Sequence, residues 1–210
     1  MVAFASHQIK IALKFDLAAP APNFKPDWNK PPTEPMLVAI RSEDGKRIPK
    51  MMRWGLLPYW AKDEKLSYST FNARSEDFTI RPAFRDAWKR GQRCLVVTDG
   101  FYDWKKLTVK NEQPYAIAMA EGGMMVMAGL WAMWRDLKSR NEVLSCTILT
   151  CRPNDVMAEL HDRMPVILTE SDWPKWLGEE PANEKELLAL LKRCPNEALK
   201  IWPVGAAAAT

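Results

Sequence analysis

The chain has 210 residues, of which 47% are hydrophobic and 27% charged, as in an ordinary globular domain. No apolar run approaches the roughly 18 residues that a membrane span needs, so we expect no contact with a membrane. A net charge of +4 favours an anionic partner only weakly, and four cysteines without CxxC spacing argue against a zinc site or a disulfide framework.

The start of the chain, MVAFASHQIKIALKF, lacks the basic, apolar and small-residue succession of a signal peptide. We therefore expect a cytoplasmic protein. Its length and composition predict one domain over residues 1–204, followed by a disordered low-complexity tail, GAAAAT, at residues 205–210.

The first 35 residues are rich in proline, and repeated X-Pro steps disfavour helix. We expect this segment to be either an ordered loop on the domain or a flexible arm. Residues 36–40 form a short apolar strand, and residues 47–54 return as the second arm of a hairpin.

Further along, helices are expected to be short and strands numerous. The pattern predicts helices at 82–91, 154–160, 171–178 and 183–194, and strands at 93–100, 113–119, 124–131, 143–150 and 164–168. The alternation in 143–150 indicates a half-buried strand, and Asn154 is expected to be a helix N-cap. Without regular βαβ alternation, this order predicts an α+β fold: a mostly antiparallel β-sheet or barrel core with short flanking helices.

Residues 159–169, ELHDRMPVILT, contain one of the two histidines of the chain. His161 lies between Asp162 and Arg163, directly before an apolar segment. A neighbouring carboxylate can orient an imidazole, and such a histidine suits proton transfer at neutral pH. The alternative is a histidine whose hydrogen bonds are satisfied by nearby backbone.

Two further segments carry polar side chains that suit a reactive site. In GFYDWKK, Asp103 lies between two aromatic residues, where a raised pKa would suit a general acid or base; the alternative is a carboxylate that faces water. In FNARSE, Asn72 and Arg74 share one face of a strand, where they could bind phosphate or orient a carbonyl group. The alternative for this segment is a polar loop.

Aromatic residues are concentrated in RWGLLPYW, which offers Trp54, Tyr59 and Trp60 next to Arg53. Aromatic side chains with arginines are the combination that stacks and holds single-stranded bases. A packed aromatic core explains the same residues nearly as well.

Taken together, RWGLLPYW, FNARSE, GFYDWK and LHDRMPVIL resemble, in order and spacing, the SOS-response-associated peptidase (SRAP) family, over about Asn29 to Val204. The resemblance implies an SRAP-like fold, binding of single-stranded DNA, recognition of abasic sites and an autoproteolytic peptidase activity. Family members crosslink to the sugar aldehyde through an N-terminal cysteine: the α-amine forms an imine and the thiol closes a thiazolidine ring. An α-amine, with a pKa of about 7.7–8.0, is partly neutral at pH 7 and can attack the aldehyde.

The resemblance also implies roles for individual residues. Asp103 assists proton movement, His161 protonates the sugar oxygen or the intermediate, and Asn72 positions the reacting groups. DNA contacts are expected from Trp60, Arg74, Arg81, Arg85, Trp104 and Arg163. We expect no metal or other cofactor, a monomer in the cytoplasm, and association with the nucleoid when DNA is bound.

The chain departs from the family pattern at three places. Val2 stands where the family has its nucleophilic cysteine, Asp103 is one methylene shorter than the usual glutamate, and both ends look altered. Without the thiol no thiazolidine can form, so the α-amine is expected to form only a reversible imine that permits β-elimination. The alternatives are a non-catalytic module that binds single-stranded DNA and an inactive paralogue.

Overall fold

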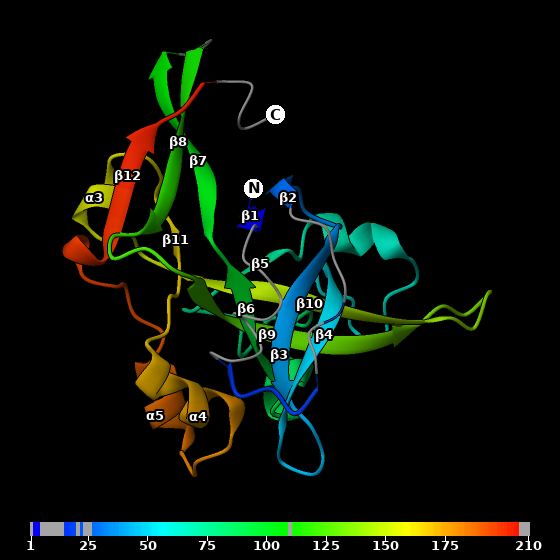
Figure 1. The fold of residues 1–210 in the computed structure, drawn as a ribbon. Helices are drawn as coiled ribbons and strands as arrows, with labels where there is room; N and C mark the ends of the chain where they lie inside the picture. The colour runs from blue at the N-terminus through cyan, green and yellow to red at the C-terminus, as the bar shows by residue number, and fades with distance from the viewer. Residues whose placement is uncertain (1, 5–14, 20–21, 23–26, 109–110, 206–210) are drawn as a thin grey trace.

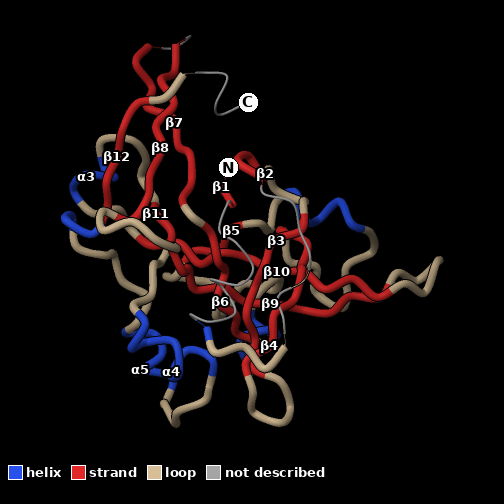
Figure 2. The backbone as a smooth tube through the Cα atoms, in the orientation of Figure 1, coloured by secondary structure: helices blue, strands red, loops and turns tan. Residues whose placement is uncertain are grey.

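The computed structural model describes residues 2–4, 15–19, 22, 27–108 and 111–205. Within these residues the chain is mostly strand, with a few short helices at the edges (Figures 1 and 2). The predicted α+β class with an antiparallel core is confirmed. Apart from Gly205, the expected tail at 205–210 lies outside the described residues. None of the described helices is both long and apolar enough to cross a bilayer.

Five strands close into a barrel. They are β3 (Pro35–Arg41), β4 (Arg47–Trp54), β6 (Arg93–Thr98), β9 (Met125–Arg135) and β10 (Glu142–Cys151). Their order is β10-β4-β3-β6-β9, and a further pairing of β10 with β9 completes the ring. All of these pairings are antiparallel except β10 with β4. The predicted hairpin at 36–40 and 47–54 is therefore the β3–β4 pair.

Strand β10 is the seam of the barrel. The prediction of a half-buried strand was wrong for its second half, because residues 145–151 are all buried. The reason is tertiary. In addition to β9 and β4, β10 pairs with β5 (Asn72–Arg74) and β11 (Met164–Pro165), so strands cover it along most of its length.

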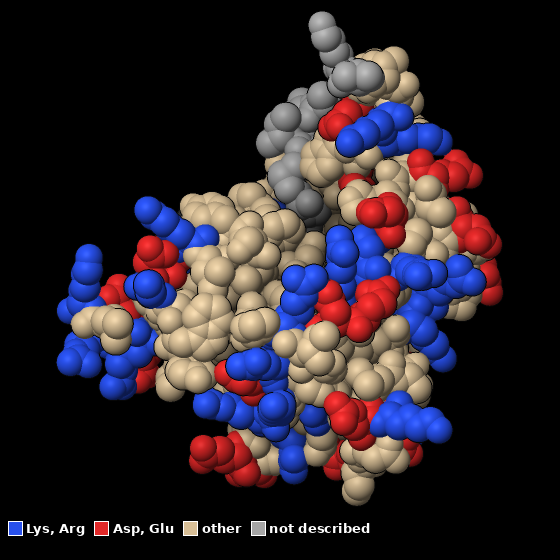
Figure 3. Space-filling view, turned by 180° about the vertical axis from the view of Figure 1, so that it is seen from behind, with Lys and Arg blue, Asp and Glu red and all other residues tan. Residues whose placement is uncertain are grey.

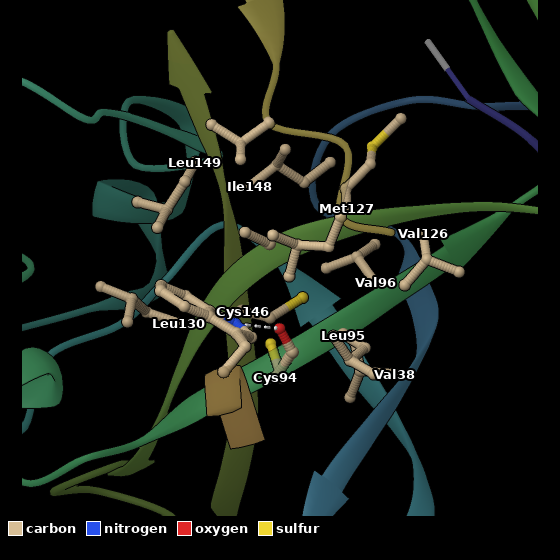
Figure 4. Packing of buried hydrophobic residues seen from close by; sticks show 14 of the residues in the cluster. Val38, Cys94, Leu95, Val96, Val126, Met127, Leu130, Cys146, Ile148 and Leu149 are labelled. Carbon is tan, nitrogen blue, oxygen red and sulfur yellow. Dashed lines mark hydrogen bonds between the residues drawn. The ribbon is translucent and has the colours of Figure 1, made fainter. Parts of the chain in front are cut away.

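The barrel interior contains two cysteines. Cys94 on β6 and Cys146 on β10 are fully buried and lie together among aliphatic side chains such as Leu130 and Ile148 (Figure 4). Burial raises the pKa of the Cys146 thiol to about 12 and also raises that of Cys94. Both thiols are therefore neutral and pack as small apolar side chains.

A second sheet of five strands projects from the barrel (Figure 1). Its order is β12 (Leu199–Pro203), β8 (Asn111–Met119), β7 (Gly100–Thr108), β1 (Val2–Phe4) and β2 (Asp27–Lys30). At the start of β7, a Cβ on Gly100 would lie 2.4 Å from the carbonyl oxygen of Ile117, so only glycine permits the close approach of β8.

The proline-rich beginning of the chain therefore includes two short strands. The sequence predicted a loop or an arm, because neither segment has strand periodicity. Both become strands through pairing: β1 pairs with β7, and β2 pairs with β1.

The helices are short and lie outside the sheets. They are α2 (Arg85–Lys89), α3 (Asp155–Ala158), α4 (Trp173–Leu177) and α5 (Glu184–Ala189), with 3-10 turns at Glu64–Tyr68, Glu170–Asp172 and Asn196–Ala198. Asn154 caps α3 as predicted, since its side chain accepts a hydrogen bond from the Met157 amide. The predicted helix at 183–194 is shorter than expected. It ends at Ala189. Beyond it, the carbonyl oxygens of Cys194 and Pro195 accept hydrogen bonds from the side chain of Asn154.

Candidate active site

A cavity of about 190 Å³ lies where β5, β7 and the segment before β11 meet. Three predicted residues, Asn72, Asp103 and His161, line it. The other lining residues are Pro32, Trp54, Phe71, Phe101, Tyr102, Trp104, Met127, Ile148, Thr150, Arg163, Met164 and Pro165. The fold thus brings the polar residues of three separate motifs to one hollow with a largely apolar wall.

Asn72 is placed by the short strand β5. This strand runs parallel to β10, with Asn72 opposite Ile148 and Ala73 opposite Leu149. Ala73 is buried, while Asn72 and Arg74 are exposed on the other face. The predicted shared face is therefore present, and it turns the Asn72 amide to the cavity.

Asp103 lies on β7 and is partly buried. Burial raises the pKa of its carboxyl group, whereas the hydrogen bond from the Trp104 amide (2.9 Å) and the charge of His161 act in the opposite direction. The carboxyl group therefore holds its proton to a higher pH than a solvated aspartate does. A group of this kind at a cavity suits proton transfer.

The hydrogen bonds of His161 select its tautomer. Its Nδ1 accepts a hydrogen bond from the Arg163 amide at 3.0 Å and lies 3.1 Å from Oδ1 of Asp162. Because an Nδ1 that accepts this bond carries no hydrogen, the neutral ring is protonated at Nε2. Protonation of the ring would turn Nδ1 into a donor toward Asp162. Nδ1 therefore has a hydrogen-bond partner in either form of the ring: the Arg163 amide when it is bare and Asp162 when it carries a hydrogen.

Arg163 connects the segment that carries His161 to the barrel. Its two terminal nitrogens each lie 2.7 Å from a carboxylate oxygen of Glu76, and Nη2 also donates to the Thr150 carbonyl oxygen at 2.6 Å. This pairing raises the pKa of Arg163 and lowers that of Glu76. The guanidinium is thus engaged within the protein, and its contact with DNA stays a prediction.

The beginning of the chain lies beside the cavity. Val2 is opposite Phe101 and Ala3 opposite Gly100 on β7 (Figure 1). Phe101 lines the cavity, and Asp103 is two residues further along the same strand, about 7 Å away at the usual rise of a strand. The backbone of residue 2 therefore comes close to the carboxylate of the site.

The six predicted DNA contacts separate into two groups. Trp104 and Arg163 line the cavity, and Arg74 lines a cleft next to it. Trp60, Arg81 and Arg85 line neither hollow. All three are exposed; Arg81 bonds to Asp77 at 2.8 Å, and Arg85 lies 3.6 Å from Asp86. Their contacts with DNA also stay predictions.

Sequence reasoning named Trp54 only as an aromatic residue that could stack bases or pack in a core, and the structure places it in the wall of the cavity. Trp54 donates its ring N–H to the Phe71 carbonyl oxygen at 2.8 Å, and the two rings meet edge to face. The following Gly55 has φ +136°, and a Cβ there would lie 2.4 Å from the Ser67 carbonyl oxygen. The Trp-Gly pair in RWGLLPYW was the available signal, because a required glycine holds the tryptophan at this turn.

No cysteine in the described part of the chain can stand in for a nucleophile at the cavity. None of the four lines it. Burial raises the pKa of Cys151 to about 11 and also raises that of Cys194. The described residues also contain no cluster of three or more metal-ligating side chains.

The face seen from behind in Figure 3 carries both positive and negative side chains, with no broad region of one charge among the described residues. Figure 3 shows lysines and arginines gathered near the middle of this face with carboxylates among them. On this face positive charge is therefore confined to local clusters interrupted by carboxylates.

The comparison with known proteins decides the family. The model of the SOS response associated peptidase (SRAP) family matches residues 2–209. The chain belongs to the SRAP family. It is 35% identical over 189 residues to the abasic site processing protein YoqW of Bacillus subtilis, covering 90% of this chain and 83% of that protein. It is 30% identical to the abasic site processing protein HMCES of Xenopus tropicalis, covering 86% of this chain and 62% of that protein.

Solved structures agree with this membership. A crystal structure of a protein from Bordetella bronchiseptica superposes with a TM-score of 0.81 at 26% identity, covering 97% of this chain and 98% of the other. One from Bacteroides thetaiotaomicron gives a TM-score of 0.73, also at 26% identity, over 83% and 75% of the two chains. The barrel with its projecting sheet is thus a fold that this SRAP-family chain shares with solved proteins.

Proposed function

We propose that this protein processes abasic sites in single-stranded DNA, through a reversible imine in place of a stable crosslink. The observation that supports the proposal most is the meeting of Asn72, Asp103 and His161 at one cavity beside β1. The names of the relatives, which are abasic site processing proteins, point to the same substrate.

The first step is attack on the ring-opened sugar. The α-amine at the beginning of the chain bonds to C1′ of the aldehyde, and loss of one water gives the imine. As an imidazolium, His161 donates its Nε2 proton to the departing oxygen and is left neutral, with its remaining hydrogen on Nδ1 beside Asp162. The Asn72 amide, which lines the same cavity, orients the sugar.

The second step follows from the missing sulfur. With Val2 in place of cysteine, no thiol adds to the imine, so the intermediate either hydrolyses or eliminates. In β-elimination a base removes the C2′ proton, the C3′–O bond breaks, and the 3′ phosphate leaves with the bonding electron pair. Asp103 is suited to take that proton, since its carboxyl group lies at the cavity and is partly desolvated.

The test is a gel assay with abasic single-stranded DNA. The native protein should give a covalent band only when borohydride reduces the imine to an amine, and strand cleavage without reductant. Val2→Cys should convert this into a heat-stable adduct that needs no reductant, while the matched control Val2→Ala should behave like the native chain. Mass spectrometry of the trapped peptide identifies the reacting amine.

A different result would contradict the proposal in a specific way. A heat-stable adduct of the native protein without reductant would show that the account of Val2 is wrong. An absent band under all conditions, with binding that weakens steeply with salt, would support the second candidate, a non-catalytic module that binds single-stranded DNA. The aliphatic residue at position 2 is what favours that candidate.

A further inference from the structure

A second hollow adjoins the candidate active site. It has a volume of about 460 Å³ and is lined by Arg74, Arg152, Pro153, Asp162, Arg163 and Arg193. Arg163 lines both hollows, so the two are contiguous. We call the second hollow the arginine cleft. Four of its six lining residues are arginines, against one carboxylate.

Three of the four arginines are available to a ligand. Arg163 is held by Glu76, but Arg74 and Arg152 form no ion pair with the residues that the structure describes. Arg193 makes a long hydrogen bond of 3.4 Å to the Pro153 carbonyl oxygen, and in the described chain it too lacks a carboxylate partner. Arg81 and Arg85, which sequence favoured as DNA contacts, each have an aspartate close by.

The cleft is built before any ligand arrives. Asn154 is buried and donates to the carbonyl oxygens of Cys194 (3.1 Å) and Pro195 (3.4 Å). Beside it, Asp155 and Asn196 exchange two hydrogen bonds, of 3.1 and 3.0 Å. These bonds fasten the segment that carries Arg152 to the segment that carries Arg193. The backbone segments that carry two arginines distant in sequence are thereby held close together, which lowers the cost of bringing their positive charges to one ligand.

We propose that the arginine cleft binds a backbone phosphate of the DNA strand on one side of the abasic nucleotide, with Arg74, Arg152 and Arg193 as its contacts. This inference rests on the proposed function, because the abasic sugar must occupy the adjoining cavity. Guanidinium groups match phosphate oxygens in geometry and charge. Arg163 then has a structural role, because its pairing with Glu76 forms the partition between the sugar and the phosphate.

The first experiment measures binding of abasic single-stranded DNA as a function of salt. Arg152→Ala/Arg193→Ala should weaken binding by about tenfold or more at low salt and reduce the slope of log K against log salt by about 0.7, the value for one single-strand phosphate. The matched control, Arg41→Ala/Lys46→Ala, removes two positive charges near the β3–β4 turn, outside both hollows, and should leave the slope unchanged. An unchanged slope in the cleft variant would overturn the proposal.

The second experiment tests position. Two oligonucleotides carry the abasic nucleotide at opposite ends, so that flanking phosphates extend only to its 5′ side or only to its 3′ side. The cleft variant should lose affinity for one of the two and retain it for the other. Equal losses for both would mean that the arginines act as general charge and would overturn the assignment.

The two proposals can fail separately. At saturating DNA the cleft variant should still give the borohydride-trapped band, because the groups of the adjoining cavity are intact. A native protein without this band contradicts the proposed chemistry, whereas a native salt slope in the cleft variant contradicts only the cleft.

Arg152→Lys/Arg193→Lys keeps the charge and should retain most of the salt slope. If the alanine variant unfolds, the lysine variant takes its place. A lysine variant that retains the salt slope but no longer distinguishes the two oligonucleotides as the native protein does supports the cleft. A lysine variant that distinguishes them as the native protein does, with native affinity, overturns guanidinium recognition.

Discussion

Two regions of this protein hold an acidic group whose pKa is raised by the same cause. In the barrel interior, loss of solvent raises the pKa of Cys146 to about 12; at the cavity, loss of solvent raises that of Asp103. The consequences differ because only Asp103 lines a hollow that a substrate can enter. Desolvation makes a group inert in the core and reactive at a cavity, so a raised pKa indicates a site only together with access.

The largest effect is expected on the rate of strand cleavage, when the carboxyl group of Asp103 is replaced. Asp103→Asn keeps the shape of the side chain but removes its proton transfer, so the single-turnover rate of strand cleavage should fall by about 100-fold or more. DNA affinity should change little. The control is Asp136→Asn in the loop between β9 and β10, which should cleave at the native rate. A native rate in Asp103→Asn would remove the carboxylate from the mechanism.

A smaller effect is expected in the barrel. Cys146→Ser places a hydroxyl group where the side chain is fully buried, so the free energy of unfolding should fall by about 1–3 kcal/mol. Chemical denaturation measures the change, with Cys146→Ala as a variant that adds no polar group. Strand cleavage should be unaffected in both. A folded serine variant with impaired cleavage would break the distinction between core and cavity.

The smallest effect concerns the pH dependence of stability. The pKa of Asp103 is higher in the folded protein than its ordinary value of 3.8, so the folded state binds more protons between these two values. The contribution of Asp103 to stability is therefore fully present below pH 3.8 and is lost as the pH rises through the folded pKa. Asp103→Asn should gain stability relative to the native chain across this window. A constant difference between the two, measured by denaturation from pH 3 to 8, would show that the carboxyl group is not desolvated.

Local patterns predicted much of the fold. The β3–β4 hairpin follows from an apolar run, a turn and a returning strand, and the cap at Asn154 follows from residue type alone. The helix at 183–194 was predicted too long because hydrophobic spacing continues to Cys194. In place of its last turns, the chain near Cys194 hydrogen-bonds to Asn154. This contact joins segments about 40 residues apart, so no local sequence pattern predicts it.

The candidate site was predicted in part. Asn72, Asp103 and His161 follow from the motifs, and the structure places all three at one cavity. The pairing of Arg163 with Glu76 could not be predicted, because both residues carry charges that could equally face a ligand. Arg152 and Arg193 were not identified at all. Each is a single arginine in an ordinary segment. Only the fold shows that the two line the same cleft.

The amino-acid sequence by itself determined the family, the α+β class and the residue types that the chemistry uses, because motif spacing and hydrophobic alternation are local properties of the chain. The tertiary structure alone decided which arginines are paired and which are available, and how β1 comes to lie against β7. These outcomes depend on distances between segments far apart in sequence. Such distances are set by the packing of the whole chain, and packing is a property that no single segment carries.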